Sequence, residues 1–274
     1  MDDDLTQALA WAEWLGAHAL PVLAAALLVV LFACTALVVG FHRYGARAVW
    51  GRWPRHVLLG VCLALGAGVL VATASLFAEM LEAFDANEEI GRFDERLAET
   101  LARELPRSAL RFFGAWTHLG DPWALTLLVT GVAVLLLVRR HTPLALGWVV
   151  ACAGGGLLNR VLKQIFERVR PLHDHGFAQA DGYSFPSGHT VGSVVVYGML
   201  AYLCLRLLPP RWHLGGVLLA ATLAFTTGWS RVILQVHWAS DVMAGFAFGV
   251  AWLTLCIVAI EVNYRRMPPA AGGG

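Results

Sequence analysis

The sequence predicts an all-α integral membrane protein, and its composition and its long apolar runs are the two observations that predict this class. Of the 274 residues, 58% are hydrophobic and 14% are charged, whereas soluble chains average roughly 45–50% apolar and ~25% charged residues. The mean hydropathy is +0.64. Disordered and collagen-like chains are excluded, because neither class is this rich in apolar side chains.

Seven apolar runs have about the length that a helix needs to cross a bilayer, roughly 17–25 residues. We expect the first run to remain as a membrane span, because the N-terminal Met1-Asp2-Asp3-Asp4 lacks the basic segment of a cleaved signal. The third run, 123–138, is short, so six spans are the alternative count. The seven runs centre near Leu28, Val69, Thr130, Val150, Gly198, Ala221 and Ala251.

Arginines in the short connections predict the orientation, because cytoplasmic loops collect basic residues. They follow the first, third, fifth and seventh runs, which share one side of the membrane only if seven spans exist. The acidic N-terminus and the connections after spans two, four and six then face outward. The arginines are Arg43, Arg47, Arg52 and Arg55, then Arg139 and Arg140, then Arg206 and Arg211, and finally Arg265 and Arg266.

The overall charge of the chain excludes nucleic acid as a partner, and a longer polar segment lies between spans two and three. A formal net charge of +1 gives no field that would recruit nucleic acid. Between spans two and three, apolar residues recur at helical spacing among acids and arginines, which predicts a helix on the membrane surface. A packing collar and a lipid gate are equally open roles for it. The apolar positions are Ile90, Phe93, Leu97 and Leu101.

The first of three polar segments on the outward side leaves the end of span four. It contains Lys163 and Arg170-Pro171. Basic residues at helix ends usually extend to the interface, so this segment alone is weak support for a site.

The second polar segment, Pro186-Ser187-Gly188-His189, directly precedes the fifth apolar run. Proline suits the first turn of a helix, which would place the Ser187 and Gly188 N–H groups among the unpaired donors of a helix N-terminus. Such a terminus binds anions, and Gly188 lets an anion approach the backbone. A plain turn would explain the proline and glycine, but it gives His189 no role.

The third polar segment runs from Ser230-Arg231 to His237 and Asp241. Four residues separate His237 from Asp241, so on a helix the carboxylate can hold one imidazole nitrogen and leave the other free as a base or nucleophile. A satisfied hydrogen bond is the commoner meaning of an isolated pair. Here, Arg231 lies on the same outward side.

Together the three segments contain the groups that phosphoryl transfer needs. Lys163, Arg170 and Arg231 would neutralise phosphate oxygens. His237 would attack phosphorus and His189 would protonate the leaving oxygen. Because the two histidines need opposite protonation states, the rate should be bell-shaped in pH.

The three segments, in order, resemble the K-x6-R-P, P-S-G-H and S-R-x5-H-x3-D pattern of the type 2 phosphatidic acid phosphatase superfamily, which includes bacterial lipid phosphate phosphatases. The resemblance covers the chain from the second span onward. It implies a six-span helical bundle, to which this chain adds one N-terminal transmembrane helix. The expected parts are 1–56 for the extra segment and basic loop, 57–264 for the membrane domain, and 265–274 for a disordered tail.

The resemblance also implies a metal-independent phosphohistidine mechanism without a cofactor. It makes His237 the nucleophile, Asp241 its orienting group and His189 the general acid. The phosphate-binding residues it implies are Lys163, Arg170, Ser187, Gly188 and Arg231.

A bacterial inner-membrane phosphatase with an outward-facing site follows from these expectations. Its partners would be membrane lipids, including a lipid phosphate substrate. Undecaprenyl diphosphate leads over phosphatidylglycerol phosphate and phosphatidic acid. A lipid phosphotransferase would use the same residues, and a noncatalytic transporter or binder of anionic lipid is the alternative from another class.

We expect no metal site at His173, Asp174 and His175, because adjacent loop residues rarely complete a tetrahedral set.

Overall fold

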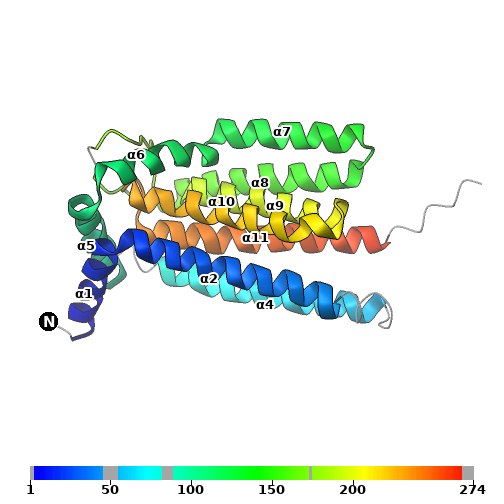
Figure 1. Ribbon diagram of the computed structural model, residues 1–274, viewed down its shortest axis with the longest axis horizontal. Helices are drawn as coiled ribbons and strands as arrows, with labels where there is room; N and C mark the ends of the chain where they lie inside the picture. Colours follow the sequence, from blue (N-terminus) through cyan, green and yellow to red (C-terminus); the bar gives the residue numbers. More distant parts are fainter. Residues whose placement is uncertain (1–2, 46–54, 82–88, 173–174, 267–274) are drawn as a thin grey trace, which may run out of the picture.

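The computed structural model describes residues 3–45, 55–81, 89–172 and 175–266. The described chain is a bundle of long helices with shorter helices across one end (Figure 1). The elements are α1 (Asp3–Ala17), α2 (Ala19–Gly40), η1 (Phe41–Gly45), α4 (Arg55–Leu81), α5 (Glu89–Glu104), α6 (Arg107–Trp116), η3 (Thr117–Gly120), α7 (Pro122–Val138), α8 (Thr142–Phe166), α9 (Gly188–Leu207), η4 (Pro210–Trp212), α10 (His213–Ile233) and α11 (Ala239–Arg266).

Each predicted apolar run is a helix, which confirms the all-helical membrane fold. Within the described residues, six helices are long and apolar enough to cross a membrane: α2, α4, α8, α9, α10 and α11. The segment from α6 through α7 is bent by 41° at its break and would form a seventh span. The short run at 123–138 is α7, a helix of 17 residues. It is short for a span by itself, which is why six spans were the alternative count.

Helix α9 forms the centre of the bundle and packs against α8, α10 and α11. Its apolar side chains meet those of α8 and α11 in the main core, which includes the fully buried Trp148 and Met199. Gly198 lies directly against Leu253 of α11. Small residues let membrane helices approach closely, and a side chain at this position would collide with Leu253. This packing fixes the N-terminus of α9, where the second polar segment lies.

Helix α2, the predicted extra N-terminal span, lies at the edge of the bundle against α10. It has no buried residue, and its outward face exposes large side chains such as Leu28 and Phe32. An apolar face of this kind is stable in hydrocarbon. The position of α2 shows that it supports α10 from outside.

Two helices cross the end of the bundle that carries the polar segments (Figure 1). The predicted surface helix is α5, and α1 packs against it. Leu97 and Leu101 of α5 are buried in a cluster with Val232 and Val242, so one face of α5 packs on protein. The sequence did not predict α1, because its 15 residues fit neither a span nor a clear amphipathic pattern.

The connections α7–α8 and α9–α10 and the C-terminal end of α11 lie together at the opposite end of the bundle (Figure 1). These parts and the adjoining helix ends hold six arginines of the orientation argument, namely Arg139, Arg140, Arg206, Arg211, Arg265 and Arg266. Arg43 lies in η1 and Arg55 begins α4. Helix α11 extends to Arg266. The remainder of the expected tail, and Arg47 and Arg52 of the basic loop, lie outside the described residues.

Candidate active site

All three polar segments meet at one end of the bundle, around a cavity of about 760 Å³. The cavity wall includes residues of α7, α8, α9 and the α10–α11 connection. The predicted residues that line it are Lys163, Arg170, Gly188, His189, Arg231 and His237. Lys163 and His237 are 74 positions apart in the sequence, and the fold brings both to the wall of this cavity.

His237 and Asp241 form the expected pair, with 3.2 Å between Nδ1 and Oδ2. They do not share a helical face as predicted, because α11 begins at Ala239 and His237 precedes it. The Asp241 carboxylate instead lies in the first turn and also accepts the Trp238 N–H at 3.0 Å. A carboxylate in this position stabilises the helix N-terminus, so local helix capping holds the pair in place.

His237 is only 4% exposed. Its Nε2 lies 2.9 Å from Nη1 of Arg170, on the ring edge opposite Asp241. Burial lowers the pKa of His237 well below its usual range, and Arg170, Arg231 and Lys163 lower it further. The imidazole is therefore neutral at neutral pH, and its Nε2 lone pair accepts a hydrogen bond from Arg170.

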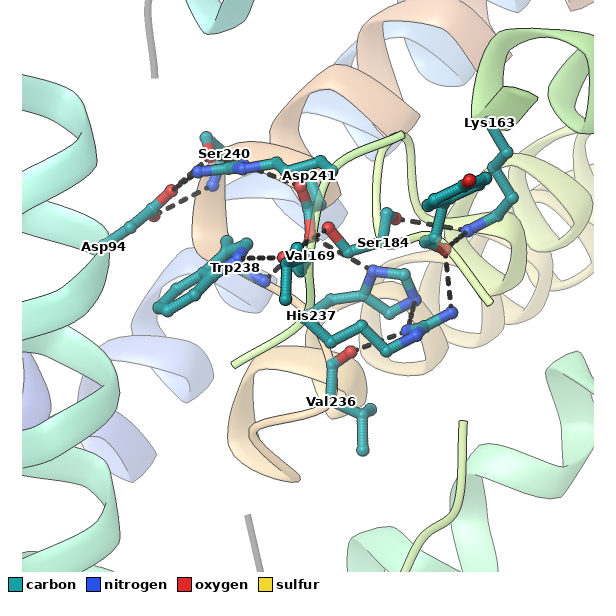
Figure 2. A network of polar contacts seen from close by, with 12 residues as sticks. Asp94, Lys163, Val169, Ser184, Val236, His237, Trp238, Ser240 and Asp241 are labelled. Carbon is teal, nitrogen blue, oxygen red and sulfur yellow. Dashed lines mark hydrogen bonds and ion pairs between the residues drawn. The ribbon is translucent and has the colours of Figure 1, made fainter. Parts of the chain in front are cut away.

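A buried network extends from Asp241 to the surface helix α5, and sequence reasoning missed it. Arg168 donates to Asp241 Oδ1 at 2.7 Å and to Asp94 Oδ2 at 3.0 Å. Ser240 also binds Asp94. Figure 2 shows these contacts running from Asp94 past Ser240 to Asp241 and His237, with Lys163 beyond. Arg168 lies inside the first polar segment, but no local pattern pairs it with Asp94, 74 positions away.

The three predicted cations are held by different parts of the chain. Lys163 donates to the carbonyls of Tyr183 and Ser184. Arg170 donates to the Val236 carbonyl at 2.7 Å as well as facing His237. Arg231 donates to Thr117 Oγ1 at 2.8 Å. Backbone and hydroxyl oxygens thus position these cations, and none of them forms an ion pair within the described residues.

The start of α9 differs from the prediction in one respect. Ser187 is the N-cap residue and Pro186 precedes it, so the proline lies outside the first turn. The Ser187 N–H is not free, because it donates to the Asp241 carbonyl at 3.1 Å. This bond joins the second and third segments. A side chain at Gly188 would approach Asn159 Nδ2 to 3.1 Å, so glycine keeps this wall of the cavity open.

Several buried polar atoms beside the site have no partner within the described residues. Among them are Ser187 Oγ, Arg231 Nε and Asn159 Oδ1. Buried polar groups are normally hydrogen-bonded, so such a group of atoms indicates a polar ligand. A hydroxyl and a guanidinium N–H are donors that fit an anion. No motif in the sequence singles out Asn159.

His189 has a carboxylate partner that the sequence analysis missed. Its Nε2 lies 2.9 Å from Oδ1 of Asp121, the N-cap residue of α7. Asp121 also accepts from His118 at 2.7 Å and from Trp123 at 3.0 Å. An Asp-Pro pair at a helix start is ordinary in sequence, so only the fold reveals this contact across 68 positions.

Residues 173 and 174 lie outside the described residues. His175 binds the Leu234 carbonyl at 2.8 Å through Nε2, and its Nδ1 accepts the Phe177 N–H. Both ring nitrogens therefore serve the local structure of the loop.

The fold and site define a helical membrane protein in which two histidine–carboxylate pairs and three cations converge on one cavity. Residues 144–265 match the PAP2 superfamily, which confirms the family resemblance expected from the three segments. This stretch of the chain is therefore similar to the PAP2 superfamily, and it contains all three polar segments.

Individual relatives agree with this family. The chain is 34% identical over 141 residues to phosphatidylglycerophosphatase B of Bacillus subtilis, covering 49% of this chain and 66% of that protein. It is 29% identical over 134 residues to an undecaprenyl-diphosphatase of Sulfolobus acidocaldarius, covering 47% and 61%. The matches thus span less than two thirds of these relatives.

A solved structure is similar over more of the chain. The crystal structure of the first transmembrane PAP2 type phosphatidylglycerolphosphate phosphatase, from Bacillus subtilis, superimposes with a TM-score of 0.63 at 28% identity. The similarity covers 72% of this chain and 98% of that one.

Proposed function

We propose that this chain is a membrane phosphatase that hydrolyses a lipid phosphate or diphosphate through a phosphohistidine at His237. The observation that carries the proposal is the position of His237 Nε2, which is 2.9 Å from Arg170 and belongs to a cavity that Lys163 and Arg231 also line. A neutral imidazole beside three cations is suited to attack a phosphorus atom whose oxygens those cations bind.

The first half-reaction moves the phosphoryl group to the enzyme. His237 Nε2 forms a bond to phosphorus while the bond from phosphorus to the lipid oxygen breaks. The His189 imidazolium gives its proton to that oxygen, and the lipid leaves. In this scheme His189 takes up its proton together with the incoming phosphate anion, whose negative charge adds to that of Asp121 at 2.9 Å. In the second half, neutral His189 takes a proton from water as the water oxygen bonds to phosphorus, the bond from phosphorus to Nε2 breaks, and inorganic phosphate leaves with His237 restored.

Asp241 keeps His237 in the reactive tautomer. By accepting a hydrogen bond from Nδ1–H at 3.2 Å, it keeps the lone pair on Nε2, which Arg170 gives up when it turns to the phosphate. It also stabilises the cation that forms when Nε2 is phosphorylated. Arg168 and the Trp238 N–H hold this carboxylate in turn. The chain's own cations supply the charge stabilisation in this scheme, so we propose that turnover is metal-independent.

A lipid substrate fits the shape of the cavity. From the phosphate-binding end, its wall continues along apolar side chains of α7, α8 and α9, namely Leu125, Val129, Leu157 and Val195. Leu157 is exposed on a helix that is long enough to span the bilayer. A hydrocarbon tail can therefore follow this wall while its phosphate reaches His237.

The arginine distribution supports an outward-facing site in a bacterial inner membrane. The basic connections lie at the end opposite the cavity (Figure 1), and the positive-inside tendency assigns that end to the cytoplasm. Undecaprenyl diphosphate leads our choice of substrate, because a relative carries that activity in its name and the lipid carrier is released at the outer face. Phosphatidylglycerol phosphate and phosphatidic acid follow.

Phosphate release from a panel of these lipids by purified protein in detergent, with a chelator present, tests the proposal. Release that survives the chelator and disappears in His237→Asn is the expected result. A parallel reaction with a lipid alcohol acceptor detects phosphotransfer to lipid. No phosphate release and no phosphorylated acceptor from folded protein would contradict the proposal.

A further inference from the structure

One cation in the cavity has no task in the mechanism above. Arg160 of α8 lines the same cavity as Lys163, and its side chain is exposed. Within the described residues, its guanidinium forms no hydrogen bond or ion pair. An arginine within a membrane-spanning helix is energetically unfavourable unless water or a ligand solvates it, and Arg160 lies in the wall of the cavity that the other cations line.

The helix register places Arg160 on the bilayer side of Lys163. Residues three apart share a helical face and are separated by about 4.5 Å along the axis. Since α8 ends at Phe166 near the phosphate-binding end, Arg160 lies further toward the membrane. Cys152 and Gly156 continue the same cavity-lining face. The lipid part of a substrate must leave in this direction.

The charge of the wall also favours a second anion. Arg160 adds a fourth cation to Lys163, Arg170 and Arg231, whereas the carboxylates that line this cavity are Asp121 and Asp181. Asp121 already binds His189. A lipid diphosphate carries more negative charge than a monophosphate, and arginine binds phosphate through paired, charge-assisted hydrogen bonds.

We propose that Arg160 binds a phosphate group that stays on the leaving lipid, which makes it a specificity-determining residue for lipids with two phosphates. This inference rests on the proposed phosphatase function. For a diphosphate, His237 takes the terminal phosphoryl group, the bridging oxygen keeps the bonding electron pair, and a lipid monophosphate leaves against Arg160. Phosphatidylglycerol phosphate also has a second phosphate, beyond a glycerol spacer, and it is the other source of the same chemistry.

The test compares substrates with one tail and different head groups. Full-length wild type, Arg160→Gln and Arg160→Lys are assayed for kcat/KM on undecaprenyl diphosphate and undecaprenyl phosphate, and on phosphatidylglycerol phosphate and phosphatidic acid. Arg139→Gln is the matched control, because Arg139 is an exposed arginine in the α7–α8 turn at the other end of the bundle.

Losing a charge-assisted phosphate contact should lower kcat/KM about 10- to 100-fold. We expect Arg160→Gln to show this loss on undecaprenyl diphosphate with less than about a threefold change on the monophosphates, and Arg160→Lys to recover part of it. The same loss confined to phosphatidylglycerol phosphate would support the proposal and assign the spaced phosphate as the ligand.

Equal loss on mono- and diphosphates, or no loss on any substrate, would overturn the role of Arg160 while the phosphatase function stands. Wild-type activity restricted to monophosphates would overturn it in the same way. Wild type that releases phosphate from no lipid would overturn both, and this outcome is recognisable before any variant is measured.

Discussion

The two histidine–carboxylate pairs of the site are built in different ways. His237 and Asp241 are four residues apart, fully enclosed, and held together by the start of α11. His189 and Asp121 come from α9 and the start of α7, 68 positions apart, and both side chains retain 16–19% exposure beside the cavity. A buried neutral imidazole suits a nucleophile, whereas a ring that faces the cavity and a carboxylate suits a proton donor. The proposed mechanism uses this difference, with His237 as the nucleophile and His189 as the proton donor.

The largest effect is expected from His237→Asn. Without a nucleophile no covalent intermediate forms, so kcat should fall by at least ~10⁴-fold on every substrate. Because His237 is buried, size-exclusion behaviour and thermal unfolding must be measured alongside phosphate release. Measurable burst kinetics in a folded variant would refute the nucleophile assignment.

Asp241→Asn should come next, with a loss of about 10³- to 10⁴-fold, because an amide can bind the wrong histidine tautomer. The change also leaves Arg168 without one of its two carboxylates, so the thermal midpoint should fall as well. Arg168→Met separates the two effects: it should also lower the thermal midpoint, because it leaves buried Asp94 without its cation, but it should cost less of the rate, because Asp241 still holds His237. An equal loss of rate in the two variants at an equal loss of stability would show that Asp241 acts only through packing.

His189→Asn should lower kcat about 100-fold on lipid monophosphates, whose alkoxide leaving group needs a proton. The loss should be smaller on lipid diphosphates and aryl phosphates, because their leaving groups are more acidic. Rates on a series of leaving groups measure this slope. An equal loss across the series would remove His189 from the role of general acid.

Asp121→Asn should have a smaller effect, about tenfold on kcat, because Asp121 acts through His189 and does not touch the reacting atoms. Its removal withdraws the negative charge that favours the imidazolium, so the alkaline limb of the pH profile should move to lower pH. An unchanged pH profile with a lower rate would indicate a purely structural role at the start of α7.

The smallest expected effect concerns the proton on His237. Its lowered pKa means that the ring stays neutral as pH falls through 6.5 and gains a proton only below that value. Arg170→Gln removes one of the cations that lower it, so the pKa should rise. A nitrogen-15 NMR titration of labelled histidine measures the shift, and a ring that is charged at pH 7 in wild type would contradict this account.

The contrast between a pair that is local in the sequence and a pair that joins distant helices also explains what could be predicted from the sequence. Helix positions follow from local hydrophobic periodicity, and the His237–Asp241 pair follows from spacing within five residues. Contacts such as Asp121–His189 and Asp94–Arg168 depend on how distant helices pack, and no local pattern encodes them. The start of α9 differs from the prediction in a related way. The Ser187 N–H, which was expected to be unpaired, donates to the Asp241 carbonyl of another helix. Long-range hydrogen bonds thus set the details that periodicity leaves open.

Trapping the covalent intermediate tests the central claim most directly. Wild-type protein is mixed with a lipid phosphate labelled with phosphorus-32 at the transferred group, quenched within one turnover in base, and digested for mass spectrometry. We predict an acid-labile, base-stable phosphoryl group on His237 that is absent from His237→Asn. Phosphate release without labelled protein under these conditions, or a label on another residue, would contradict the phosphohistidine mechanism.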